Sequence, residues 1–141
     1  MPHDFKRFPE LTNNQMDFYY WESPHRQIME TFNGKIVRVI DGDTVRVGTN
    51  FRDFETVVRF FDNEAPELDE RGGLESKEWL ESQILGKEVT IEIEPNLRVE
   101  KWGRILGKII FGGIDIGEQS IIAGKSVSWG NRNDGRLNAA I

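Results

Sequence analysis

The stretch Gly34–Gly48, GKIVRVIDGDTVRVG, contains the pattern that decides the fold. Apolar residues alternate with polar ones at Val45 and Val47, as in a strand with one buried face, and a bend is expected between Ile36 and Val39. The Asp-Gly-Asp sequence at 41–43 is typical of a tight turn. The stretch therefore predicts two strand arms joined by a turn that carries two carboxylates.

Strand and helix patterns follow one another over the rest of the chain. Ranges 55–61, 88–94 and 103–111 predict strands, 73–85 predicts a helix, and 116 to about 125 predicts a short helix. Gly112-Gly113 is typical of a tight hairpin turn. Short alternating strands with few helices predict an α+β, mainly β, fold: a small closed barrel with helices packed around it.

Composition limits the class of protein and the kind of metal site. The chain has 141 residues, which fits one compact domain, and no apolar stretch long enough to cross a membrane. It has no cysteine and two histidines, so any metal would be held by oxygen, as Ca²⁺, Mg²⁺ or Mn²⁺ is. The net charge of −6 argues against a large basic surface, although a metal and a few arginines can still bind phosphate locally.

Residues 1–33 differ from the rest and predict an N-terminal extension to a domain spanning 34–141. They contain the aromatic run Asp17–Trp21 and no sustained period. We expect these aromatic side chains to pack onto the barrel as core filler; a platform for nucleic acid, a partner or a second copy is the alternative. The first residues lack a secretory signal, which predicts an intracellular, cytoplasmic protein, with a virus or plasmid as alternative sources of the gene.

Four short features carry the chemistry, and each alone is more often structural than catalytic. They are the Asp-Gly-Asp-Thr turn at 41–44, Arg59 in an apolar strand, Glu64-Ala-Pro-Glu67 in an acidic loop, and Trp102-Gly-Arg104 before a strand. Asp62, Asp69 and Glu70 in the same loop are expected to be solvated charges.

Taken in this order, the four features resemble the staphylococcal (micrococcal, or thermonuclease) nuclease family. The resemblance is clearest over 34–127 and includes the strands GKEVTIEI and EKWGRILGKI. It implies a five-stranded barrel of the oligonucleotide/oligosaccharide-binding type and calcium-dependent hydrolysis of DNA and RNA phosphodiester bonds with low sequence specificity.

The resemblance also assigns roles to residues. Asp43, Glu64, Thr44 and the backbone carbonyl of Ala65 would surround Ca²⁺, while Asp41 lies nearby without being a direct ligand. Arg59 and Arg104 would bind the scissile phosphate, and Glu67 would act as the general base. These residue types suit the reaction, because hard oxygen ligands hold Ca²⁺ and guanidinium groups stabilise the charge that the phosphate gains.

Two departures from the family pattern leave an alternative open. Glu64 stands where aspartate is usual, which moves the carboxylate by about 1.5 Å and makes other divalent metals an alternative to Ca²⁺. The C-terminal half lacks the family's stacking tyrosines, for which Trp129 is the candidate substitute. The alternative function is a catalytically impaired module that binds single-stranded nucleic acid or a protein partner, and a third reading is an assembly domain that docks through 1–33.

Overall fold

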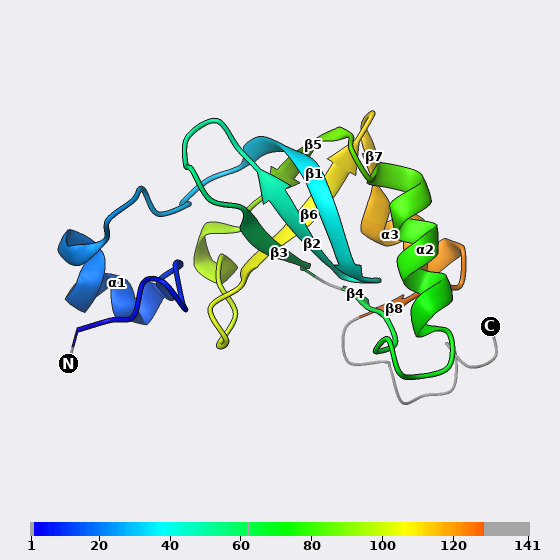
Figure 1. Ribbon diagram of the computed structural model, residues 1–141, viewed down its shortest axis with the longest axis horizontal. Coiled ribbons are helices and arrows are strands. Elements are labelled where there is room, and N and C mark those ends of the chain that lie inside the picture. The colour runs from blue at the N-terminus through cyan, green and yellow to red at the C-terminus, as the bar shows by residue number, and fades with distance from the viewer. Residues whose placement is uncertain (1, 62, 129–141) are drawn as a thin grey trace.

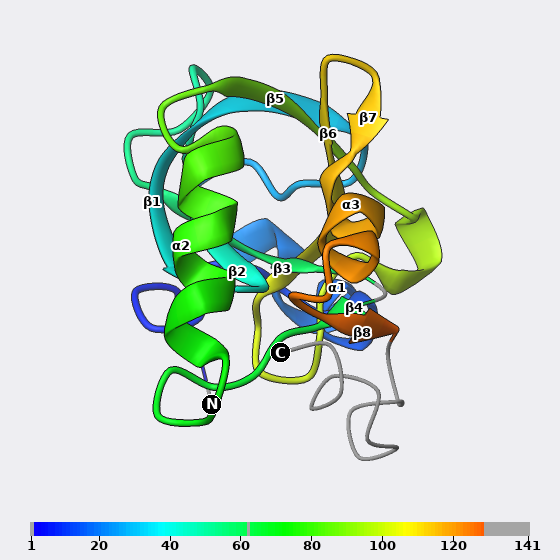
Figure 2. The same ribbon diagram turned by 90° about the vertical axis from the view of Figure 1, so that its right-hand side faces the viewer.

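Five strands form a closed barrel in the computed structural model, which describes residues 2–61 and 63–128 (Figures 1 and 2). They are β1 (Phe32–Asp41), β2 (Thr44–Gly48), β3 (Thr56–Phe60), β5 (Glu88–Glu92) and β6 (Ile105–Phe111). Hydrogen bonds join them in the order β3-β2-β1-β5-β6, and a parallel pairing of β3 with β6 closes the ring. The expected α+β, mainly β, fold is confirmed, and the barrel is consistent with the oligonucleotide/oligosaccharide-binding type.

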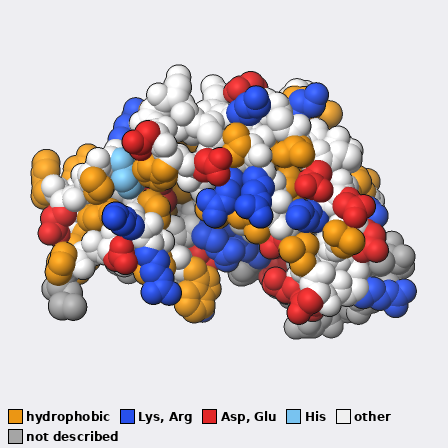
Figure 3. All heavy atoms as spheres, viewed as in Figure 1, with side chains coloured by type: hydrophobic (Ala, Val, Ile, Leu, Met, Phe, Trp, Pro, Cys, Tyr) orange, Lys and Arg blue, Asp and Glu red, His pale blue; other side chains and the backbone are white. Residues whose placement is uncertain are grey.

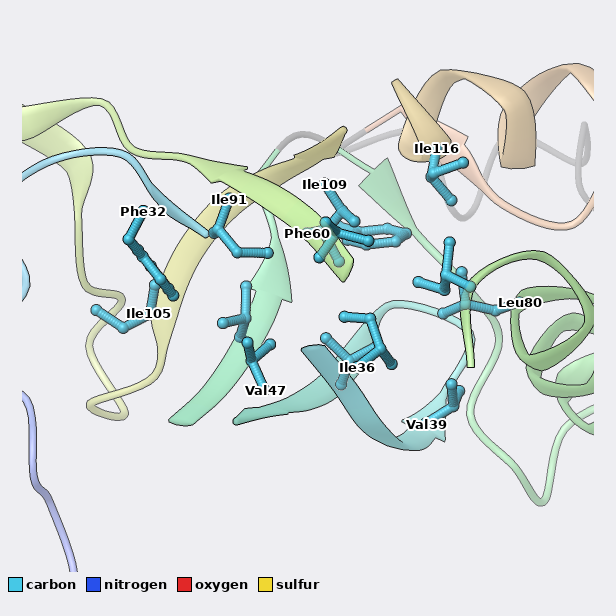
Figure 4. Packing of buried hydrophobic residues seen from close by; sticks show 14 of the residues in the cluster. Phe32, Ile36, Val39, Val47, Phe60, Leu80, Ile91, Ile105, Ile109 and Ile116 are labelled. Carbon is cyan, nitrogen blue, oxygen red and sulfur yellow. The ribbon is translucent and has the colours of Figure 1, made fainter. Parts of the chain in front are cut away.

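Helices α2 (Gly73–Ile84) and α3 (Ile116–Ile122) lie together at one end of the barrel (Figures 1 and 2). Alternate strand residues such as Val45, Val58 and Ile105 are buried in the barrel. Figure 4 shows Ile105 and, from α2, Leu80 in the same cluster. Each such side chain contributes roughly 1.5–3 kcal/mol when it leaves water. The remaining members of this cluster are Ile28, Phe32, Ile36, Val39, Val47, Phe60, Ile84, Val89, Ile91, Ile93, Ile109 and Ile116.

Turns and bends confirm several local predictions. The register of β1 against β2 shifts between Ile36 and Arg38 and again between Val39 and Asp41, which produces the expected bend. Gly112 and Gly113, with φ of 58° and 79°, form the two-residue turn between β6 and β7 (Ile114–Asp115). Two-residue strands β4 (Asn63–Glu64) and β8 (Val127–Ser128) pair outside the barrel and were not predicted.

The N-terminal segment, residues 2–31, is tied to the barrel by a buried arginine. Arg98 follows the 3-10 helix η2 (Pro95–Leu97) and is fully buried. Its Nε donates to the Ile28 carbonyl at 2.6 Å, and its Nη1 donates to the Leu11 carbonyl at 2.7 Å. Burial lowers the pKa of Arg98, and Glu10 opposes that shift. One side chain therefore joins two distant parts of the segment to the loop after β5.

The prediction that the aromatic run packs as core filler is wrong for most of its members. The run lies on α1 (Asn13–Tyr19) and the 3-10 helix η1 (Tyr20–Glu22), neither of which has a buried residue. Phe18 is 78% exposed and Trp21 is 92% exposed. Leu11 and Ile28, on either side of the run, are buried instead, and their backbone carbonyls accept the hydrogen bonds from Arg98.

Two further expectations concern membrane-spanning segments and the boundary of the N-terminal extension. Within the described residues, no helix combines the length and apolarity required to cross a bilayer. The division at residue 33 stays a prediction; the first barrel strand begins at Phe32.

Replacing Arg98 by alanine should destabilise the protein by at least about 3 kcal/mol, because two buried carbonyls lose their donor and a cavity forms. Urea unfolding followed by tryptophan fluorescence measures the change. Arg26→Ala is the control, since the Arg26–Glu30 pair is well exposed and its loss should cost less than about 0.5 kcal/mol. Equal stability losses in the two variants would contradict the anchoring role of Arg98.

Candidate metal and phosphate site

The turn between β1 and β2 is fixed by its own side chain and by close packing. The Asp41 Oδ1 accepts a hydrogen bond from the Asp43 backbone N–H at 3.1 Å. A Cβ on Gly42 would lie 2.0 Å from the Ser76 Oγ and 2.6 Å from the Ala65 Cβ. Only glycine therefore lets the turn approach α2 and the acidic loop this closely.

The Asp43 carboxylate is the centre of the site. It is buried, with the residue 8% exposed. Its Oδ1 accepts from the Thr44 hydroxyl at 2.9 Å, and its Oδ2 accepts from the Ala65 backbone N–H at 3.0 Å. The Arg59 Nη2 lies 3.5 Å from the same Oδ2. The structure thus brings together four predicted site residues from three separate segments. Ala65 makes this contact through its backbone N–H, and the role assigned to its carbonyl stays a prediction.

Arg59 reaches this centre from the outer face of β3. It pairs with Thr44 across the β2–β3 ladder, and its Nη1 donates to the Phe60 carbonyl at 3.2 Å. The Phe60 N–H in turn donates to the Asp43 carbonyl at 2.9 Å. The guanidinium is therefore held beside the turn by backbone as well as side-chain contacts.

Arg104 is positioned by Glu100, a residue that the sequence analysis missed. The Glu100 carboxylate accepts from the Arg104 Nη2 at 3.0 Å and from the backbone N–H groups of Trp102 and Arg104, each at 3.1 Å. The hydrogen bond that Arg104 donates to Glu100 raises the pKa of Arg104, with smaller contributions from the charges of Asp43 and Asp41. A glutamate four residues before the arginine was the available signal.

The guanidinium of Arg104 keeps one donor for a ligand. Its Nε is buried and finds no acceptor within residues 2–61 and 63–128. An unsatisfied buried donor is unfavourable and is expected to accept a partner such as a phosphate oxygen. Arg104 lines the same groove as Asp41 and Thr44, which brings its side chain to the region of this centre.

Asp41 and Asp43 form a close carboxylate pair. Burial is the main cause that raises the pKa of Asp41 to about 7, and the hydrogen bond and negative charge of Asp43 add to it. Two carboxylates in one partly buried place disfavour their joint ionisation. A positively charged ligand would relieve this repulsion.

Glu64 and Glu67, two further predicted site residues, lie in the acidic loop after β3. Glu64 is half-buried on β4, whose register places it opposite Val127 of β8. Glu67 is exposed, and its backbone N–H donates to the Glu70 Oε1 at 2.7 Å. Asp69 and Glu70 are exposed, whereas Trp129 and Asp62 lie outside the described residues. In the part of the chain that is described, no three acidic or histidine side chains converge as a metal cluster.

Comparisons with known proteins give weak but concordant similarities. No family model matches the chain. It is 31% identical over 96 residues, 64% of its length, to an uncharacterized protein of Bacillus anthracis, of which the match covers 44%. It is 32% identical over 77 residues, 55% of its length, to a protein of Escherichia coli named an uncharacterized endonuclease, and 31% identical over 77 residues to a protein of the same name in strain O157:H7. The matches span less than half the length of these relatives, 44% and 47%.

Replacing Gly42 by alanine should destabilise the protein by about 1–3 kcal/mol, because the new methyl group overlaps Ser76 and Ala65. Thermal or urea unfolding measures this loss. Gly48→Ala is the matched control, since its Cβ would meet only the Val37 Cγ1, at 3.4 Å, and should change stability by less than about 0.5 kcal/mol. A Gly42→Ala variant as stable as wild type would show that the turn does not need this close approach.

Proposed function

We propose that the chain is a calcium-dependent nuclease of the staphylococcal nuclease type, which hydrolyses phosphodiester bonds of DNA and RNA with low sequence specificity. The observation that carries the proposal is the meeting of the buried Asp43 carboxylate with Thr44, Arg59 and Ala65. The endonuclease names of the two Escherichia coli relatives support it.

The donor set fits a hard cation. Asp43 and Glu64 offer carboxylate oxygens, Thr44 a hydroxyl and Ala65 a backbone carbonyl, all of which suit Ca²⁺. The close carboxylate pair of Asp41 and Asp43 adds a field that attracts positive charge. When bound, the cation would supply positive charge that offsets the negative charge gained by the reacting phosphate. The extra methylene of Glu64 leaves Mg²⁺ and Mn²⁺ as further candidates.

The protein's own residues would perform the remaining steps. Arg59 and the Nε of Arg104 would hold the scissile phosphate through forked, permanently charged donors. A water molecule attacks phosphorus, Glu67 accepts its proton, and the bond from phosphorus to the 5′ oxygen breaks. The leaving oxygen takes a proton from solvent, and the product keeps a 3′ phosphate. Exposure of Glu67 gives its carboxylate ready access to water.

A second candidate is a catalytically silent module on the same barrel, binding single-stranded nucleic acid or a protein partner. The contact between Arg59 and Asp43 favours it, because the arginine partly neutralises the carboxylate that a metal would need. Metal-dependent cleavage and joint binding of metal and nucleotide separate the two functions.

The wild-type protein should degrade single-stranded DNA and RNA when Ca²⁺ is present and should stop when a chelator removes it. Glu67→Gln should lower the cleavage rate about 10²- to 10⁴-fold, since the glutamine cannot accept the proton. A gel or fluorescence assay measures the rates, and Asp69→Asn, which removes a charge from the same exposed loop, is the control. Undiminished cleavage by Glu67→Gln would remove this residue from the mechanism. Absence of cleavage by wild type with any divalent metal would refute the nuclease proposal.

Glu64→Gln tests the metal ligand without relying on turnover. Ca²⁺ and a nucleoside 3′,5′-bisphosphate together should raise the melting temperature of the wild-type protein more than either alone, because each binds only the folded site. The variant should lose this joint increase, since an amide is a much weaker calcium ligand than a carboxylate. A full joint increase in Glu64→Gln would exclude Glu64 from the metal site.

A further inference from the structure

A groove of about 930 Å³ lies between the barrel and the N-terminal segment and adjoins the candidate site. Asp41, Thr44 and Arg104 belong both to this groove and to the site described above. The N-terminal segment contributes Phe5, Lys6 and Arg7 to its lining. The groove therefore connects a part of the chain without an assigned role to the proposed phosphate site.

A row of arginines crosses the outer face of the barrel beside this groove. Arg46 of β2 pairs with Arg38 of β1 on one side and with Val57 of β3 on the other. Arg104 immediately precedes Ile105, which pairs with the residue after Val57, so it extends the row at the start of β6. Figure 3 shows Lys and Arg side chains gathered at the middle of this face.

The cross-strand pair Arg38–Arg46 is unfavourable for the isolated protein. Like charges directly opposite one another on a sheet destabilise it. Within the described part of the chain, neither arginine has a salt bridge to an acidic side chain. Two adjacent arginines without a counter-charge are explained by a polyanionic ligand that supplies it.

The arginine row and the candidate site lie on the same face of the sheet, two residues apart along β2 and β3. Arg46 lies two residues after Thr44 on β2, and Val57 lies two residues before Arg59 on β3. Residues two apart on a strand point to the same face with a spacing of about 6.6–6.8 Å. A chain with regularly spaced phosphates could therefore contact Arg59 and the arginine row at once.

The N-terminal wall of the groove is held in place by buried polar contacts. The Gln27 Oε1 accepts from the Leu11 N–H at 2.8 Å, and its Nε2 donates to the Pro9 carbonyl at 2.9 Å. Glu10, which lines the groove, forms a buried salt bridge with Arg52 and is thereby neutralised. Lys6 and Arg7 remain exposed at the groove, where Asp53 and Glu55 are the other acidic lining residues outside the site.

We propose that this groove binds a single-stranded polynucleotide through its phosphates, on the side of the site bordered by the N-terminal segment. The proposal rests on the proposed function and extends its substrate contacts to Lys6, Arg7 and Arg46, which line the groove, and to Arg38, which pairs with Arg46 beside it. Phe5 and Phe54 line the groove, as does Trp102, which is 63% exposed. These rings offer stacking surfaces for unpaired bases, which a paired duplex does not present.

The test compares the double variants Arg38→Gln/Arg46→Gln and Lys6→Gln/Arg7→Gln with Lys35→Gln/Lys87→Gln. The control pair is exposed, lies outside the groove and removes the same charge. Fluorescence anisotropy with labelled oligo-dT and oligo-rU of about 4 and 16 nucleotides, in chelator, measures binding without cleavage. Each groove variant should weaken binding of the longer strand about tenfold and reduce the slope of log affinity against log salt by about 1.4. Unfolding midpoints check that the variants are folded.

The outcomes separate this inference from the proposed nuclease activity. The groove proposal is supported if wild type binds the longer strand more tightly than the shorter one and only the groove variants lose affinity. This holds even if no metal leads to cleavage. The groove proposal is overturned if the groove variants bind the oligonucleotide as tightly as wild type does. It is also overturned if the control pair loses as much affinity as they do. Both results hold whether or not wild type cleaves. Equal binding of a duplex of the same length overturns the single-strand assignment. Comparing oligo-dT with oligo-rU shows whether DNA or RNA is the preferred strand.

Discussion

The parallel pairing of β3 with β6 is the constraint on which the rest of the structure depends. It joins Val58 to Ile105 and closes a barrel whose other neighbouring strands are antiparallel. Closure places Arg59 and Arg104, one residue along each strand in opposite directions from that pair, on the same outer face of the barrel. The Phe60 N–H, at the end of β3, then fixes the Asp43 carbonyl. Without this one long-range pairing, Arg104 would have no fixed location beside Arg59 and the turn, which the β2–β3 ladder already joins.

Burial of the Asp43 carboxylate links stability and chemistry at this location. A buried carboxylate is costly unless donors satisfy it, and here Thr44, Ala65 and Arg59 do so. The same arrangement places the Asp43 carboxylate, partly neutralised by Arg59, next to a second carboxylate of raised pKa, Asp41. On the proposed function, the contact between Arg59 and Asp43 would have to rearrange when a cation or phosphate entered. Such a rearrangement would distinguish the proposed enzyme from a silent module.

Local sequence patterns predicted the barrel strands and α2 well, but they did not predict how the N-terminal segment is anchored or the pairing of β4 with β8. Alternation found β2, β3, β5 and β6, and the periodicity of Leu80 and Ile84 found α2. The order of the short motifs, through its resemblance to the nuclease family, also identified the four residues that meet at the site; their roles stay predictions. It missed the anchoring of the N-terminal segment, since Arg98 reads as a solvated loop residue until the tertiary fold buries it. Thr12 and Gln15 form a capping box that could have revealed α1, whereas the β4–β8 pairing joins residues too far apart for any local signal.

Net charge and local charge lead to different conclusions about substrate binding. A chain of net charge −6 repels a polyanion at long range, yet salt reduces such repulsion beyond about 8 Å under physiological conditions. Within that distance, the arginine row, Lys6 and Arg7 offer positive charge that opposes Asp53 and Glu55 at the groove. The acidic remainder of the surface then disfavours binding elsewhere, so a strand that binds at all is directed to the groove. On this argument the overall acidity of the protein contributes to where its ligand binds, and Arg38 and Arg46 tolerate each other because that ligand neutralises both.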